Sequence, residues 1–139
     1  MPRVDEVEIG QLIPGRAEVI DQARLIRYAG ASGDMNPLHW DRDFAAGVSP
    51  TGGVIGHGML SMGLVSATVT DWAGGPELVT SIAASFRAPC PVGATLHTGG
   101  EVIDVDQDAG TATLAVWAEL EDGSKVVDRR SSRATVRLT

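Results

Sequence analysis

The most distinctive feature of the hydrophobic pattern is the stretch HGMLSMGLVSATVTDW, residues 57–72, which is apolar or small at nearly every position. It contains no acidic or basic side chain between His57 and Asp71. A helix of this length without a charged face is typical of one that is buried on every side. The sequence therefore predicts a buried central helix.

Beyond this stretch the pattern changes to a period of about two. Four segments are rich in Val, Thr and Leu and are separated by the turn sequences PCPVG, QDAG and EDG. They cover residues 78–88, 95–106, 111–120 and 125–138. One buried helix followed by such strands predicts an α+β fold in which an antiparallel sheet curls around the helix. Such a sheet leaves an open edge, so we expect dimerisation through that edge or through the helix face.

The first part of the chain predicts a strand and a helix. The segment RAEVI, which follows the turn sequence IPG, reads as a first strand. Asp21 then has the position of an N-cap for a helix over QARLIRYAG, with Gly30 closing its end.

A second, short helix is predicted over RDFAA, with Asp41 as its N-cap and Gly47 as its stop. The glycine-rich segment VSPTGGVIG follows. It lacks the GK[ST] sequence of a loop that cradles phosphate groups. We therefore expect an ordinary connection there.

Composition favours one globular domain over residues 1–139, with 43% apolar and 21% charged residues. The net charge of −7 argues against nucleic acid as the main partner. A local basic patch remains compatible with this charge. Four arginines near the C-terminus either form such a patch or, as the commoner explanation, are exposed residues of a last strand: Arg129, Arg130, Arg133 and Arg137. A single cysteine, Cys90, excludes an internal disulfide, and we expect an inert thiol. No signal peptide and no apolar run of about 20 residues is found, so we expect a soluble cytoplasmic protein without membrane contact.

The stretch SGDMNPLHW contains the best candidates for chemistry, Asp34 and His39. A spacing of five places two side chains on different faces of a helix or a strand, so they can act together only if the chain bends. Asn36 and Pro37 favour such a bend. An Asp and a His can then share one water or one proton. The alternative is a turn stabilised by the Asp34 side chain, with His39 packed beside Trp40.

Gly58 stands where the first turn of the central helix leaves backbone N–H groups without acceptors. Without a Cβ it would let a ligand oxygen approach that positive helix end, as an oxyanion site requires. A close packing contact is the equal alternative. His57 reads first as a packed residue and His97 as a strand residue that is half-buried or faces solvent. With three scattered histidines and no metal-ligand spacing, we expect no metal site.

Residues 28–45, YAGASGDMNPLHWDRDFA, resemble the signature of MaoC-like (R)-specific enoyl hydratases and (3R)-hydroxyacyl thioester dehydratases. The segments VIGHGML and FRAPCPVGATL, and the opening VEIGQLIPG, are similar to further parts of that family. The resemblance runs from about Val7 to the C-terminus. It is closest to the catalytic subunit of mycolic-acid-type fatty acid elongation dehydratases.

The resemblance implies a hot-dog fold, in which a long helix is wrapped by a curved antiparallel sheet. The short helices around Asp34 and His39 would form the overhang segment that distinguishes hydratases. It also implies roles for individual residues. Asp34 and His39 would be catalytic, Asn36 and Pro37 would support their loop, the Gly58 N–H would bind the thioester oxygen, and Tyr28, His57 and Met59 would contact substrate.

The implied reaction is the reversible hydration of trans-2-enoyl thioesters in fatty acid or polyketide metabolism, without metal or cofactor. The substrate would be carried on acyl carrier protein or coenzyme A. The chain would form a homodimer or a heterodimer with another hot-dog subunit. Two alternatives remain. A hot-dog thioesterase would place a carboxylate on the central helix, and none occurs between His57 and Thr70. A non-catalytic acyl-binding subunit would lack the Asp/His pair.

Overall fold

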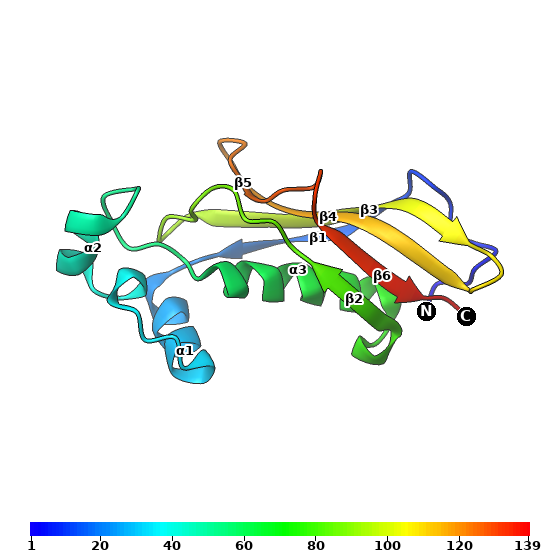
Figure 1. Cartoon of the computed structure of the whole chain (residues 1–139), viewed down its shortest axis with the longest axis horizontal. Coiled ribbons are helices and arrows are strands. Elements are labelled where there is room, and N and C mark those ends of the chain that lie inside the picture. The colour runs from blue at the N-terminus through cyan, green and yellow to red at the C-terminus, as the bar shows by residue number, and fades with distance from the viewer.

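The computed structural model describes residues 1–139 and shows one long helix, α3, lying along one face of an antiparallel sheet (Figure 1). The strand order is β1-β3-β4-β6-β2, with β5 paired to β4. Two short helices, α1 and α2, lie at one end of the molecule, and both termini lie at the other. The elements are β1 (Leu12–Val19), α1 (Gln22–Ser32), η1 (Pro37–His39), α2 (Arg42–Val48), α3 (Gly58–Ala73), η2 (Pro76–Leu78), β2 (Val79–Ala83), β3 (Thr95–Asp106), β4 (Thr111–Leu120), β5 (Lys125–Val127) and β6 (Arg133–Arg137).

The α+β architecture predicted from the hydrophobic pattern is confirmed. The two longest predicted strands, residues 95–106 and 111–120, form β3 and β4 with those bounds and pair with each other. Their fully buried side chains include Leu96, Leu114 and Val116, which belong to the hydrophobic core beneath the sheet. The alternation of hydrophobic residues in these segments thus reflects a sheet that has one face packed against the core.

Two predicted strands are shorter than expected. The segment over residues 78–88 forms β2 only as far as Ala83, and the segment over 125–138 is divided into β5 and β6. A loop separates these two strands. In it the Asp128 carboxylate accepts a hydrogen bond from the Arg130 N–H at 3.1 Å, and the Arg133 guanidinium donates to three carbonyl oxygens of the same loop. Side chains thus replace the ladder bonds that a continuous strand would make.

The predicted turn at IPG is wrong, because β1 runs through this sequence with a shift of register between Ile13 and Arg16. Gly15 makes the shift possible, since a Cβ at this position would lie 2.2 Å from the carbonyl oxygen of Thr98. Beside it the Thr98 hydroxyl lies 2.6 Å from the hydroxyl of Thr68 on α3. Thr98 on β3 is therefore in close contact with β1 at Gly15 and also connects the sheet to the central helix through its buried hydrogen bond with Thr68.

The prediction that the central helix is buried on every side is wrong for the single chain. Five of its residues face the sheet and are buried, whereas Met59, Gly63 and Asp71 are exposed and the others are intermediate. The sheet covers only one side of α3, as Figure 1 shows. The outer side of the helix is therefore partly open to solvent although it carries no charge before Asp71. None of the helices combines the length and the hydropathy that a membrane-spanning helix requires.

Candidate active site

The overhang segment between β1 and α3 holds the candidate catalytic residues. Asp21 caps α1 as predicted, accepting from the Arg24 N–H at 2.8 Å. The predicted helix end at Gly30 is wrong. The helix continues to Ser32 and ends at Gly33, whose φ is +78°. That left-handed conformation suits glycine at a helix end. It places the next residue, Asp34, at the start of the loop.

The loop bends at Asn36-Pro37, where the sequence predicts it. The Asn36 side chain accepts from the Leu38 N–H at 3.0 Å, and Pro37 begins the short helix η1. Asp34 also stabilises the bend, because its Oδ1 accepts from the Asn36 N–H at 3.2 Å. The two interpretations of Asp34, a turn residue and a partner of His39, are therefore compatible. One oxygen supports the turn and the other faces the histidine.

His39 is held in one orientation by its backbone surroundings. Its Nδ1 lies 2.7 Å from the carbonyl oxygen of Ile55, so Nδ1 carries the proton of the neutral ring. Its Nε2 therefore presents a lone pair, and it lies 3.8 Å from Oδ2 of Asp34. This distance exceeds a direct hydrogen bond. Both groups can thus address one atom placed between them, such as the oxygen of a reacting water.

His57 is a packed residue, as one interpretation of the sequence expected, and it lies behind His39. The two imidazole rings stack with centroids 3.9 Å apart and an angle of 24° between their planes. The rings of Tyr28 and His57 pack edge-to-face with their centroids 4.7 Å apart, and His57 Nε2 lies 3.3 Å from the carbonyl oxygen of Asp34. Only 2% of His57 is exposed. This burial lowers the pKa of His57, although the hydrogen bond to the Asp34 backbone opposes the shift.

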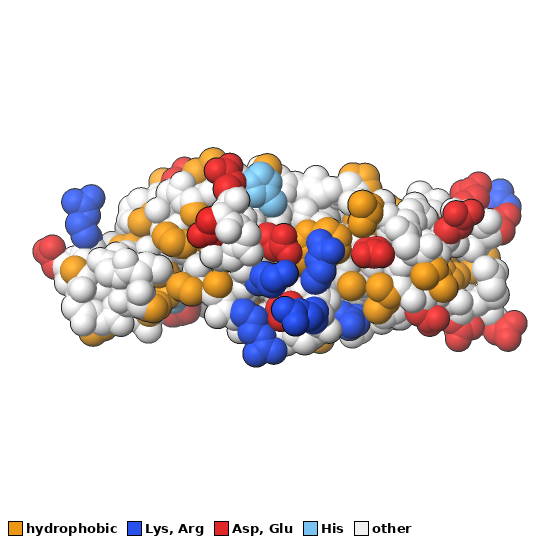
Figure 2. All heavy atoms as spheres, turned by 90° about the horizontal axis from the view of Figure 1, so that it is seen from above, with side chains coloured by type: hydrophobic (Ala, Val, Ile, Leu, Met, Phe, Trp, Pro, Cys, Tyr) orange, Lys and Arg blue, Asp and Glu red, His pale blue; other side chains and the backbone are white.

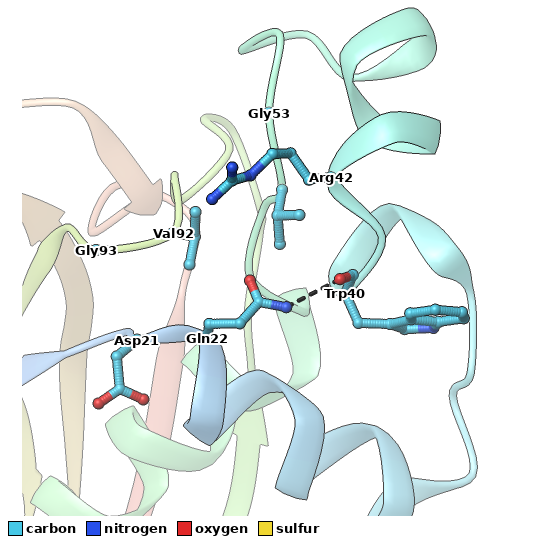
Figure 3. A pocket seen from close by; sticks show the side chains of 8 residues that line it. Asp21, Gln22, Trp40, Arg42, Gly53, Val92 and Gly93 are labelled. Carbon is cyan, nitrogen blue, oxygen red and sulfur yellow. Dashed lines mark hydrogen bonds between the residues drawn. The ribbon is translucent and has the colours of Figure 1, made fainter.

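Two residues that the sequence analysis missed hold the loop together. The indole Nε1–H of Trp40 donates to the carbonyl oxygen of Met35 at 3.0 Å. The Gln22 side chain donates to the carbonyl oxygen of Trp40 at 2.9 Å, as Figure 3 shows. Both residues line a cavity of about 560 Å³ between α1, the glycine-rich loop and the Val92–Gly93 turn. Nothing in the local pattern marks these residues, since their partners are backbone atoms.

The N-terminus of α3 opens into a second cavity of about 280 Å³, which His39 and Gly58 line together. Gly58 is the first residue of the helix, so its N–H has no intrahelical acceptor. A Cβ at this position would lie 3.5 Å from the ring of Phe86, which is an ordinary contact. The absence of a side chain is thus not demanded by packing, and it leaves the helix end open to the cavity. Ser61, one turn later, is buried and lines the same cavity.

The residues expected to contact substrate lie elsewhere. Tyr28 packs against His57, His57 is buried behind His39, and Met59 is 59% exposed. None of the three lines the cavity shared by His39 and Gly58. Cys90 does line it, but burial raises the pKa of its thiol to about 11, in agreement with the expected inert thiol.

The sequence analysis expected three scattered histidines, but two of them, His39 and His57, lie close to Asp34. The potential ligand atoms of these three residues are within 4.8 Å of one another. The rings of His39 and His57, however, are stacked and nearly parallel. Histidine binds a metal in the plane of its ring, so one ion would have to leave the plane of at least one of them. The geometry therefore favours a stacked pair over a metal centre.

Comparisons with known proteins agree on one family. The profile of the MaoC like domain matches residues 7–122. The chain is 31% identical to a 3-hydroxybutyryl-CoA dehydratase of Methylorubrum extorquens, over 85% of this chain and 74% of that protein. Among solved structures, a MaoC-like dehydratase superposes with a TM-score of 0.90 at 33% identity, covering 99% of this chain but 42% of the other. An (R)-hydratase from A. caviae involved in PHA biosynthesis gives a TM-score of 0.85 at 29% identity, over 96% and 98% of the two chains.

Proposed function

The chain belongs to the MaoC-like domain family and shares its hot-dog fold, and we propose that it is a hydro-lyase that hydrates trans-2-enoyl thioesters and, in reverse, dehydrates (3R)-hydroxyacyl thioesters. The proposal rests above all on the separation of 3.8 Å between Asp34 Oδ2 and His39 Nε2. That spacing suits two acid–base groups acting on one water.

In the hydration direction the water oxygen forms a bond to C3 of the enoyl group and loses one proton to the Asp34–His39 pair. The pair returns one proton to C2, so that water is added without any other reactant. Negative charge develops on the thioester oxygen as C3 is attacked. The Gly58 N–H and the positive end of α3 lie in the cavity that His39 lines, where they can stabilise this charge.

Asn36 and Pro37 support the reaction by fixing the bend that directs both groups to one place. Tyr28, His57 and Met59 do not line the cavity, so we propose that residues that do line it, among them Phe86 and Ser61, contact the substrate. A thioesterase activity is disfavoured, because α3 carries no carboxylate before Asp71, which forms an ion pair with Arg16 instead.

The carrier of the thioester, coenzyme A or acyl carrier protein, would approach from the side of Arg87, which lines the cavity of His39 and is 62% exposed. Lys and Arg side chains gather on one face of this acidic protein, as Figure 2 shows. Arg87 and Arg130 both pair with Asp128, and Lys125 and Arg129 both pair with Glu119. These cations could attract the phosphate groups that both carriers contain.

We also propose that a second hot-dog unit, either another copy of this chain or a different subunit, covers the outer side of α3. An uncharged helix face that is half exposed in the single chain supports this assignment. Our chain covers 42% of the similar MaoC-like dehydratase, so the rest of that protein is long enough to contain a second unit. The molar mass of the purified chain in solution, alone and with candidate partner subunits, tests this proposal.

The activity is tested by following the ultraviolet absorbance of crotonyl-coenzyme A, which is lost when the conjugated double bond is hydrated. The wild type is compared with Asp34→Asn and with Asp43→Asn, a matched control on the exposed first turn of α2. We expect Asp34→Asn to lose at least about 10²-fold in kcat/KM and the control to retain its rate. Equal rates in wild type and Asp34→Asn would contradict the mechanism. If wild type is inactive with coenzyme A esters, the same comparison on carrier-bound enoyl chains decides the proposal.

A further inference from the structure

We propose that His57 is a positioning residue for the catalytic pair, whose buried ring fixes His39 by stacking and fixes Asp34 by a hydrogen bond to its backbone. This inference rests on the proposed function. It assigns His57 a role different from direct contact with substrate.

The first support is that His57 contacts both members of the pair at once. Its ring stacks on His39 at 3.9 Å, and its Nε2 lies 3.3 Å from the carbonyl oxygen of Asp34. No other side chain described in the site bridges the two residues from behind. A displacement of His57 would therefore change their relative orientation.

The second support is the place of His57 in the fold. It is the N-cap of α3, and its carbonyl oxygen accepts from the N–H groups of Leu60 and Ser61. N-cap side chains usually bond to the helix they begin, but that of His57 makes no such bond. It extends instead into the overhang segment. The residue thus connects the rigid central helix to the loop whose geometry the reaction needs.

The third support concerns charge. Three titratable side chains face His57, namely Asp34, His39 and Tyr28. With Nε2–H donating to the Asp34 carbonyl oxygen, Nδ1 is an acceptor, and it is buried without a partner. Burial lowers the pKa of His57, and a charge on His39 lowers it further. If the ring of His57 stays neutral, His39 is the only member of the stacked pair that takes up and releases a proton in the reaction, and it does so at Nε2.

The rival interpretation is a histidine that only fills space in the overhang segment. The two interpretations differ in what substitution does. A space-filling ring can be replaced by another ring with a loss of stability alone. A positioning residue also changes the behaviour of His39.

Two variants separate the contacts of His57. His57→Phe keeps a ring that can stack but removes the Nε2–H donor, whereas His57→Gln keeps a donor but removes the ring. His97→Gln is the control, because His97 lies on β3, far along the chain from the overhang, and its side chain is 47% exposed. Each protein is assayed for kcat, KM and pH dependence on the best enoyl thioester. Each is also examined by ¹⁵N NMR of its imidazole groups.

We expect both variants at His57 to lose about 10²-fold in kcat, the scale of a misplacement by about 1 Å, with KM little changed. The pH profile should move in both and stay unchanged in His97→Gln. In wild type, the ¹⁵N spectrum of neutral His57 should show its proton on Nε2, and His57 should take up a second proton only below the pH of about 6.5 at which an exposed histidine titrates. The His39 signals should shift in both variants.

Unchanged kcat and pH profile in both variants, with only a lower melting temperature, would overturn the inference. A His57 that titrates together with His39 would also overturn it. If the wild type hydrates no enoyl thioester, the proposed function fails. The ¹⁵N spectra then still decide whether His57 orients Asp34 and His39.

Discussion

The indole of Trp40 donates a hydrogen bond to the carbonyl oxygen of Met35 across the loop that carries the candidate catalytic residues, with a nitrogen–oxygen distance of 3.0 Å. Asp34 precedes the acceptor and His39 precedes the donor in the chain. The bond therefore joins the two ends of the bend. Gln22, on α1, donates a hydrogen bond to the carbonyl oxygen of Trp40 and so attaches the Trp40 end of the loop to that helix. The separation of the pair depends on this contact as well as on Asn36 and Pro37.

Replacement of Trp40 by Phe keeps an aromatic ring and removes the donor. The lost bond contributes about 0.5–1.5 kcal/mol, so we expect a loss of stability of this size. If this energy holds the bend in place, kcat should fall by a factor of about 2 to 12. Few core contacts change, because Trp40 is 43% exposed. Trp72→Phe is the control at the far end of α3. Comparable losses of activity in both variants would show that the bond to Met35 has no special role.

Gly58→Ala tests the oxyanion site. The added methyl group fits against Phe86 at 3.5 Å, so the protein should fold, but it would block the approach of a thioester oxygen to the Gly58 N–H. We expect a loss in kcat of about 10²-fold, as for removal of one oxyanion donor.

The matched control for this experiment is Gly47→Ala on α2, away from the outer side of α3. Gly47 is exposed, and a Cβ there meets nothing within 4 Å. This variant should be more stable by about 0.5–1 kcal/mol and equally active. Full activity of Gly58→Ala in the same assay would remove Gly58 from the mechanism.

Gly33 and Gly30 offer a similar comparison next to Asp34. Gly33 has φ +78°, so Gly33→Ala should lose about 1–2 kcal/mol of stability and should lower kcat by moving Asp34. Gly30 lies inside α1 with open space around its Cβ position, so Gly30→Ala should gain about 0.5–1 kcal/mol. Urea unfolding and kcat measure both effects. The same sign of stability change in the two variants would contradict the helix end at Gly33.

The lowered pKa of His57 predicts a dependence of stability on pH. At and below about pH 6.5 an unfolded histidine binds a proton more readily than the buried His57, whose pKa is lowered. Because the unfolded state then carries more protons, the free energy of unfolding should decrease as the pH falls through this range. Urea unfolding at several pH values measures the slope. His57→Gln should reduce the slope and His97→Gln should not. An equal slope in His57→Gln and wild type would show that another group is responsible.

Those parts of the fold that depend on local pattern could be predicted from the sequence. The caps at Asp21 and Asp41, the strands β3 and β4, and the bend at Asn36-Pro37 each follow from neighbouring residues. The pairing of Asp34 with His39 required the family resemblance in addition, because a bend alone does not reveal its purpose.

Contacts between distant segments could not be predicted. The stacking of His57 on His39 joins the start of α3 to a loop from another part of the chain, and the bond from Gln22 to Trp40 ends on a backbone atom. The break between β5 and β6 depends on Arg133, whose guanidinium donates to carbonyl oxygens of the loop. The sequence around Arg133 is that of a strand and does not indicate these hydrogen bonds. The burial of α3 was overestimated because an uncharged helix face does not tell whether the chain itself or a partner covers it.

The arrangement of the overhang has a consequence for how such proteins diverge. Asp34 and His39 both lie in the single segment inserted between β1 and α3, and neither belongs to the sheet or to the central helix. After a gene duplication, one copy could exchange these two side chains and lose the chemistry while its sheet and helix continue to fold. One protein family could thus come to contain both enzymes and inactive homologues that share the same fold.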